Sequence, residues 1–257
     1  MADYHSHVGI PKCLQLEFAK KEQVVVFDIE RNKAFSSNCD KAGAENHYYT
    51  EETEQLLSNR VESGLAALIK ELRLCKSNHQ FTNCLNSHTD VLESFFKFQL
   101  QRSKRILKSI NESSIAASTL GPFSHSLYLQ IIDNTNANIL GMLGDNLFAL
   151  RVICDKDQYF VTNSLGFYYV VENKKIKYFV IPLSNKDAII IQSGVDKTKP
   201  LSHYTLDQKV NDYFNKTCYK FERELGNGYI YAKERQEMED FLAKCGLSPN
   251  ITWDKGA

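Results

Sequence analysis

The stretch from residue 148 to residue 193 constrains the fold of this chain most. It contains four or five short runs rich in Val, Ile, Phe and Tyr, separated by the turn-forming clusters DKD, NSLG, ENKK and LSNKD. β-Branched and aromatic runs between such clusters are typical of an antiparallel meander. Helical patterns precede and follow this stretch. We therefore predict an α+β fold with a central, mainly antiparallel sheet of about five to seven strands and long helices packed on it.

The length and composition of the chain fit one domain. Its 257 residues are 43% hydrophobic and 24% charged, which is ordinary for a globular protein and ample for a large core. We predict a single α+β domain over residues 1–257, with a helical region over 50–145 and a sheet region over 146–232. Apolar stripes predict helices at 50–75, 89–110, 123–144, 206–225 and 233–245, whereas residues 77–87 are predicted to form a loop.

Charge and cysteine content exclude several functional classes. The 31 basic residues balance the 31 acidic ones, which argues against an overall basic surface for nucleic acid. Seven cysteines without a CxxC pair disfavour a disulfide framework and a zinc site, and they favour a reducing cytoplasm. The N-terminus lacks a signal-peptide pattern, and the apolar runs are too short to span a bilayer. Motifs such as HExxH and GxSxG are missing, and we predict no cofactor and no metal.

Three polar residues are candidates for catalysis. His7 stands before an apolar helix, Glu62 follows a buried-face valine on the first long helix, and Arg102 lies in an apolar row of the second. A partly buried arginine needs an acidic or carbonyl partner. We predict that Glu62 pairs with Arg102, either in a catalytic set with His7 or as a structural ion pair.

Four further residues are candidates for ligand binding. Gln101 lies beside Arg102 on a helix whose basic residues either contact phosphates or form a solvated face. Asn163 and Ser164 occupy a turn between aromatic strands, and such a turn is either ordinary or faces a pocket. Asn138 belongs to the polar segment NTNAN, where a weaker hypothesis places a small-molecule pocket between the third helix and the sheet.

Several segments along the chain share motifs with one uncharacterised family. They are His7 with Pro11, NHYYTEETEQLLSNRVE (46–62), FQLQRSKR (98–105), QYFVTNSLGFYY (158–169), PLSNKDAIIIQS (182–193) and VNDYFNKTCYKFERELGNGYIYAK (210–233). These segments resemble the bacterial family known as domain of unknown function 4238. The family's turn carries an aspartate that residues 162–166 lack, which implies an impaired or altered activity if that aspartate is catalytic. The resemblance implies no assigned reaction.

Two functions remain open. The first is a binding or regulatory partner protein with a polar pocket between the helices and the central sheet, which the missing catalytic motifs favour. The alternative is a nuclease-like or nucleotide-hydrolysing effector enzyme of a bacterial defence or toxin system, in which His7 and Glu62 supply acid–base chemistry. The partners would be another protein, a nucleic acid or nucleotide, or a second copy in a homodimer, and not a membrane.

Overall fold

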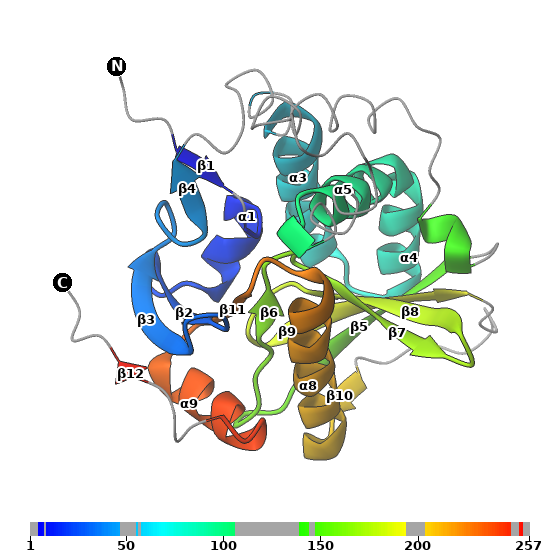
Figure 1. Ribbon diagram of the computed structural model, residues 1–257. Helices are drawn as coiled ribbons and strands as arrows, with labels where there is room; N and C mark the ends of the chain where they lie inside the picture. Colours follow the sequence, from blue (N-terminus) through cyan, green and yellow to red (C-terminus); the bar gives the residue numbers. More distant parts are fainter. Residues whose placement is uncertain are drawn as a thin grey trace.

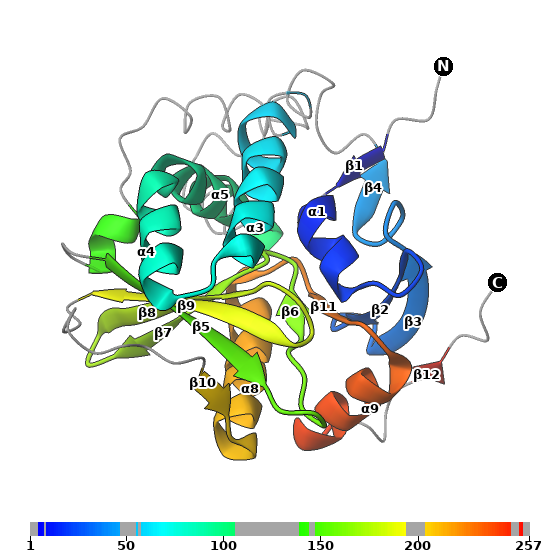
Figure 2. The same ribbon diagram turned by 180° about the vertical axis from the view of Figure 1, so that it is seen from behind.

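The computed structural model describes residues 5–7, 9–46, 55, 58–105, 139–143, 147–193, 204–247 and 252–253. Within these ranges, helices pack on two five-stranded sheets, and a two-stranded ribbon adds to them (Figures 1 and 2). The predicted α+β class is confirmed. The strands are divided between two larger sheets, although the sequence indicated one. No described helix combines the length and apolar character that crossing a bilayer requires.

The first sheet contains most of the strand-rich stretch. Its strands are β5 (Leu147–Cys154), β7 (Tyr168–Glu172), β8 (Lys175–Pro182), β9 (Asp187–Ser193) and β10 (Tyr204–Leu206). Their order is β10-β5-β9-β8-β7, in which the antiparallel run β7-β8-β9 forms the predicted meander. β5 is antiparallel to β9, and β10 is parallel to β5.

The second sheet joins distant parts of the sequence. Its strands are β2 (Gln23–Asp28), β3 (Lys33–Asn38), β6 (Thr162–Asn163), β11 (Tyr229–Ala232) and β12 (Thr252–Trp253), in the order β12-β3-β2-β11-β6. The N-terminal hairpin β2-β3 is extended by β11, which pairs with β6 in turn. Because β6 leaves the meander for this sheet, the strands form two sheets. The small ribbon pairs β1 (His5–His7) with β4 (Ala44–Asn46).

The helices cover both sheets. They are α1 (Lys12–Gln15), α3 (Ser63–Leu74), α4 (Asn78–Ser87), α5 (Thr89–Gln101), α8 (Gln208–Leu225) and α9 (Arg235–Lys244), with short turns η1 (Leu16–Phe18), η2 (Ser58–Glu62) and η4 (Leu140–Leu143). α3, α4 and α5 lie together on one side of the first sheet, and α8 lies on the other (Figure 1). The helix predicted at 123–144 falls mostly outside the described residues.

The predicted loop at 77–87 is wrong, because these residues form α4. The hydroxyl of Ser77 accepts a hydrogen bond of 3.2 Å from the backbone N–H of Gln80, which caps the helix. Phe81 and Leu85 are buried one turn apart on its inner face. A polar outer face concealed this stripe in the sequence.

The turn from Asn163 to Gly166 lies where the main layers meet. Gly166 has a φ of +73°, and a Cβ at this position would lie 3.1 Å from Leu14 of α1 and 3.2 Å from Phe95 of α5. The next residue, Phe167, packs against Phe96 with the ring planes tilted and the ring centroids 4.6 Å apart. The turn is therefore pressed against α1 and α5 at the centre of the molecule.

Candidate functional site

A buried carboxylate fixes the central turn to the end of α8. Glu222 is fully buried, and its oxygens accept hydrogen bonds from the N–H and hydroxyl of Ser164, at 3.1 and 2.7 Å. They also accept from the N–H groups of Gly228, at 2.6 Å, and Tyr229, at 2.8 Å. Gly226 passes so close that a side chain there would overlap Glu222. The lone pairs of this carboxylate are thus directed at protein donors.

Burial dominates the electrostatics of Glu222. It raises the pKa of the carboxyl to about 6, and the hydrogen bonds from Ser164, Tyr229 and Gly228 oppose that increase. The carboxylate therefore titrates in the range that suits a general acid or base. Its burial and its many donors point instead to a structural role, since no open lone pair faces a substrate.

The end of α5 is joined to the same loop. The hydroxyl of Ser103 donates to the carbonyl of Leu225, and the N–H of Lys104 donates to Oδ1 of Asn227 at 2.7 Å. The N–H of Asn227 donates to the hydroxyl of Ser164 at 2.8 Å. One continuous network thus links α5, the turn after β6 and the loop between α8 and β11.

Beside this network lies a group of buried polar side chains centred on Tyr231. The Tyr231 hydroxyl reaches the backbone where Gly9 and Gly43 meet, so that a Cβ on either glycine would lie 2.6 to 2.7 Å from it. Thr162 pairs directly with Tyr231 across the second sheet, which places both side chains on one face. Gln15 of α1 donates to the carbonyl of Ala42 at 3.0 Å, one residue before Gly43.

Two further buried polar residues lie at the C-terminal end of α5. Gln99 is fully buried, one turn after Phe95, and Arg102 follows the last residue of the helix. Burial and the charge of Glu222 raise the pKa of Tyr231, and the guanidinium of Arg102, which is 1% exposed, opposes the increase. We call Gln15, Gln99, Arg102, Thr162 and Tyr231 the central polar group.

Several atoms of the central polar group are buried without a hydrogen-bond partner. Among the residues that the structure describes, they are Oε1 of Gln15, both amide atoms of Gln99, Oγ1 of Thr162 and the hydroxyl of Tyr231. Leaving a buried polar atom unpaired costs about 1 to 3 kcal/mol, and native proteins pair the great majority of such atoms. Packing alone does not explain why so many buried polar atoms stay unpaired.

The structure places three of the predicted site residues at this centre. Asn163 and Ser164 are both fully buried. The side chain of Asn163 donates to the carbonyl of Phe167 at 2.8 Å and accepts from the N–H of Leu165 at 3.2 Å, which shapes the turn. Ser164 is bound to Glu222, and Arg102 belongs to the central polar group. These residues come together, but Asn163 and Ser164 use their polar atoms within the protein.

The other predicted site residues have fewer described connections to the central polar group. Glu62 is half-buried in η2, and burial of the thiol, followed by the charge of Glu62, raises the pKa of Cys13 on α1. No described contact joins Glu62 to Arg102, so the ion pair between them stays a prediction. The backbone of His7 pairs with Ala44 in the small ribbon. The side chains of His7 and Gln101, and the whole of Asn138, lie outside the described part of the structure.

The sequence patterns did not indicate Glu222 or Tyr231 as site residues. A signal existed for Glu222, because it follows Phe214 and Cys218 at the spacing of the buried stripe of α8 and so lies on the inner face. Tyr231 gave no signal, since its neighbours Gly9 and Gly43 are distant in sequence. Only the pairing of β11 with β2 brings them together.

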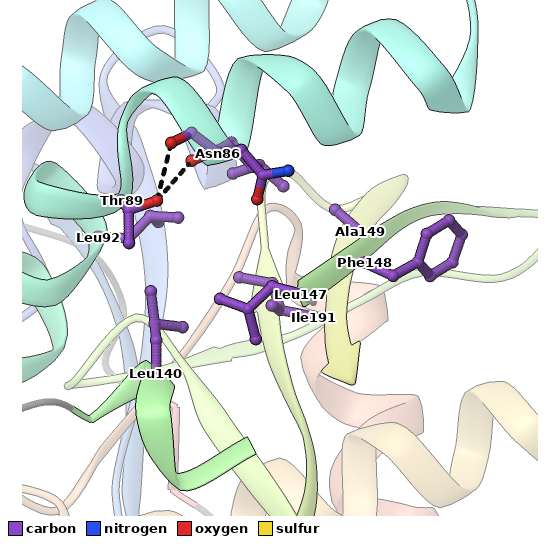
Figure 3. A pocket seen from close by; sticks show the side chains of 9 residues that line it. Asn86, Thr89, Leu92, Leu140, Leu147, Phe148, Ala149 and Ile191 are labelled. Atoms are coloured by element: carbon purple, nitrogen blue, oxygen red, sulfur yellow. Dashed lines mark hydrogen bonds between the residues drawn. The ribbon is translucent and has the colours of Figure 1, made fainter. Parts of the chain in front are cut away.

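A small cavity elsewhere is of a different character. It has a volume of about 10 Å³ and lies between α4, α5, η4 and the first sheet (Figure 3). Leu92, Leu140, Leu147 and other apolar side chains form most of its wall. There is room for about one water molecule, so this space does not suit a polar ligand.

Comparison with known proteins found a family that part of the chain resembles. No curated protein and no solved structure matched it. Residues 7–127, just under half of the chain, match a family described as protein of unknown function (DUF4238). The match excludes the motifs noted after residue 127, and the bacterial origin and cytoplasmic location stay predictions. The match confirms the resemblance drawn from the sequence over residues 7–127.

Proposed function

We propose that this protein is a binding or regulatory protein that recognises a small polar ligand at the central polar group. The observation that carries the proposal is the set of buried, unpartnered polar atoms on Gln15, Gln99, Thr162 and Tyr231. A ligand with complementary groups would satisfy atoms that otherwise cost stability, and this gain would contribute to its affinity.

The chemistry of these atoms limits the class of ligand. The amide of Gln99 offers a donor and an acceptor, Oε1 of Gln15 is an acceptor, and the hydroxyls of Thr162 and Tyr231 do both. This set suits a molecule with hydroxyl, amide or heterocyclic groups, such as a nucleoside or a sugar. It does not suit an apolar compound, which would leave the same atoms unpaired.

A binding role fits the central site better than a hydrolytic one. Glu222, the fully buried carboxylate closest to the turn, already accepts hydrogen bonds from Ser164, Gly228 and Tyr229. A general base needs a free lone pair within reach of the proton that it removes. The nuclease-like alternative therefore rests on His7 and Glu62, and its test is turnover of a nucleotide or nucleic acid.

The experiment is a ligand screen by thermal shift, followed by calorimetry. The panel contains nucleosides, nucleotides, sugars and amino acids, and each nucleotide sample is also analysed for products. We expect one class to raise Tm and to bind with a measurable Kd in the absence of turnover. Product formation that Glu62→Ala abolishes would replace this proposal with the enzymatic one.

Near-isosteric variants then locate the site. Tyr231→Phe and Thr162→Val each remove one polar atom while keeping the shape, so we expect at least tenfold weaker binding. Tyr213→Phe on the exposed face of α8 is the matched control and should bind like wild type. Equal binding by Tyr231→Phe, Thr162→Val and wild type would refute the proposed site.

A further inference from the structure

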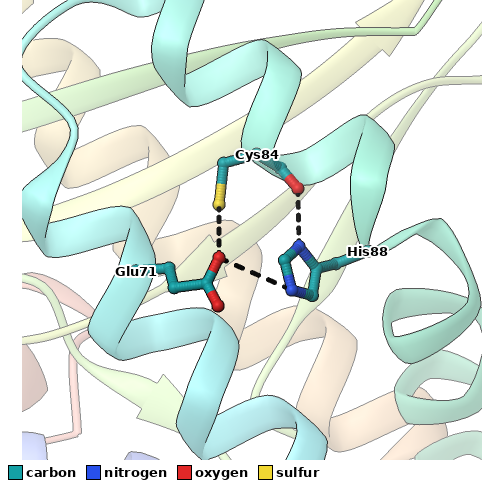
Figure 4. A group of neighbouring side chains, drawn as sticks. All are labelled: Glu71, Cys84 and His88. Carbon is teal, nitrogen blue, oxygen red and sulfur yellow. Dashed lines mark hydrogen bonds and ion pairs between the residues drawn. The ribbon is translucent and has the colours of Figure 1, made fainter.

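A cluster of metal-ligating side chains joins α3, α4 and the start of α5. Glu71, Cys84 and His88 each present one ligand atom, and these atoms lie within 4.8 Å of one another (Figure 4). Oε2 of Glu71 is 3.9 Å from Sγ of Cys84 and 3.6 Å from Nε2 of His88. The thiol of Cys75, directly after α3, donates instead to the backbone carbonyl of Glu71, at 3.6 Å. The sequence spacing did not indicate this set, because it requires α4 to be a helix.

The orientation of His88 is that of a metal ligand. Its Nδ1 lies 2.9 Å from the carbonyl oxygen of Cys84. Because a carbonyl only accepts, Nδ1 carries a proton, and Nε2 is the ring nitrogen that faces Oε2 of Glu71 at 3.6 Å. A proton on Nε2 or a bound cation would each satisfy this pair of atoms. A backbone carbonyl that fixes the imidazole tautomer is also the usual outer partner of a metal-bound histidine.

We propose that Glu71, Cys84 and His88 bind one Zn²⁺ ion that holds α3, α4 and α5 together. Zinc bonds of about 2.3 Å to sulfur and about 2.0 to 2.1 Å to nitrogen or oxygen place the atoms of a tetrahedral site about 3.3 to 3.7 Å apart. The separations of 3.6 and 3.9 Å need changes of only a few tenths of an ångström to match.

The donor types select the metal. Thiolate and imidazole ligands favour zinc over magnesium and calcium, which prefer oxygen alone. Three protein ligands leave the fourth position of a tetrahedral site to a water molecule. Glu71 is exposed and the side chains of Cys84 and His88 are half-buried, so an ion can reach the site from solvent.

Binding is expected to release protons. A cysteine binds Zn²⁺ as the thiolate, so a thiol must lose its proton on binding. The affinity for Zn²⁺ should therefore rise with pH.

The test uses the reduced, metal-stripped full chain, with Co²⁺ as a spectroscopic probe and Zn²⁺ as competitor. We expect one Co²⁺ per chain with the intense thiolate charge-transfer band and visible bands of tetrahedral coordination, displaced by one Zn²⁺. Zn²⁺ should also raise Tm. The affinity should increase between pH 6 and pH 8.

Four variants assign the ligands. Cys84→Ser should remove most of the charge-transfer absorption, and Cys84→Ser and His88→Gln should each weaken Zn²⁺ binding at least tenfold. The matched controls are Cys245→Ser, directly after α9, and His79→Gln, on the exposed face of α4; both should behave like wild type. Circular dichroism verifies that each variant is folded. A wild-type protein without the charge-transfer band, or a folded His88→Gln protein that binds Zn²⁺ as tightly as wild type, would overturn the proposal.

Discussion

Glu222 joins several segments of the fold, and its contribution to the free energy of unfolding depends on pH. Its pKa of about 6 lies above the value of 4.5 for an exposed glutamate. As pH rises, the unfolded chain ionises first, so the folded state loses stability between about pH 4.5 and pH 6. A difference of about 1.5 pKa units corresponds to about 2 kcal/mol above that range. This loss should be absent from Glu222→Gln.

The measurement is urea denaturation of wild type and Glu222→Gln at pH 4.5 and pH 7. The glutamine places an NH₂ group opposite the N–H of Ser164, so the variant should be less stable by about 1 to 3 kcal/mol at pH 4.5. The difference between the two proteins should shrink by about 2 kcal/mol at pH 7. A constant difference would mean that the pKa of Glu222 is not raised.

At the scale of elements, α4 is a helix whose polar composition hides its buried face. Polar residues dominate 77–87 and so predict a loop. In the structure, Phe81 and Leu85 form the buried stripe of a capped helix. Ser77→Ala removes the cap and should lower the free energy of unfolding by about 1 kcal/mol. Ser87→Ala is the control, since this hydroxyl donates to the carbonyl of Asn83 in the same helix and caps no N-terminus. Denaturation curves with equal midpoints for both variants would contradict the role of the cap.

The turn after β6 gives a second test at this scale. Gly166 and Gly246 have φ values of +73° and +74°, but only Gly166 is crowded by Leu14, Phe95 and Ile10. Alanine at either position pays about 1 to 2 kcal/mol for the left-handed conformation. Gly166→Ala should cost about 1 to 3 kcal/mol more, because it also overpacks the core. Chemical denaturation measures the free energy of unfolding of both variants. Equal losses of stability would show that the side chains around Gly166 move to accommodate a methyl group.

For the whole molecule, local patterns predicted the class and most elements but not the assembly. The meander β7-β8-β9 and helices α8 and α9 follow from short-range periodicity and caps, so they could be predicted. The two-residue strand β6 carries no periodicity, and its pairing with β11 divides the strands into two sheets. The same long-range pairing creates the central polar group. For this reason the sequence indicated Asn163, Ser164 and Arg102 as candidates but missed Tyr231.

The matched DUF4238 segment is not expected to fold alone. Strand β2 has β11 as a neighbour in the second sheet, and α5 packs its Phe96 against Phe167 and Phe179, at centroid distances of 4.6 and 4.9 Å. Buried apolar residues from both halves of the chain form one core cluster. A fragment of residues 1–143 would expose these surfaces to water and lose their hydrophobic stabilisation. We expect it to lack near-ultraviolet circular dichroism and a cooperative thermal transition, and to gain both when residues 144–257 are co-expressed. A cooperative transition of the fragment alone would instead make the N-terminal half an independent domain.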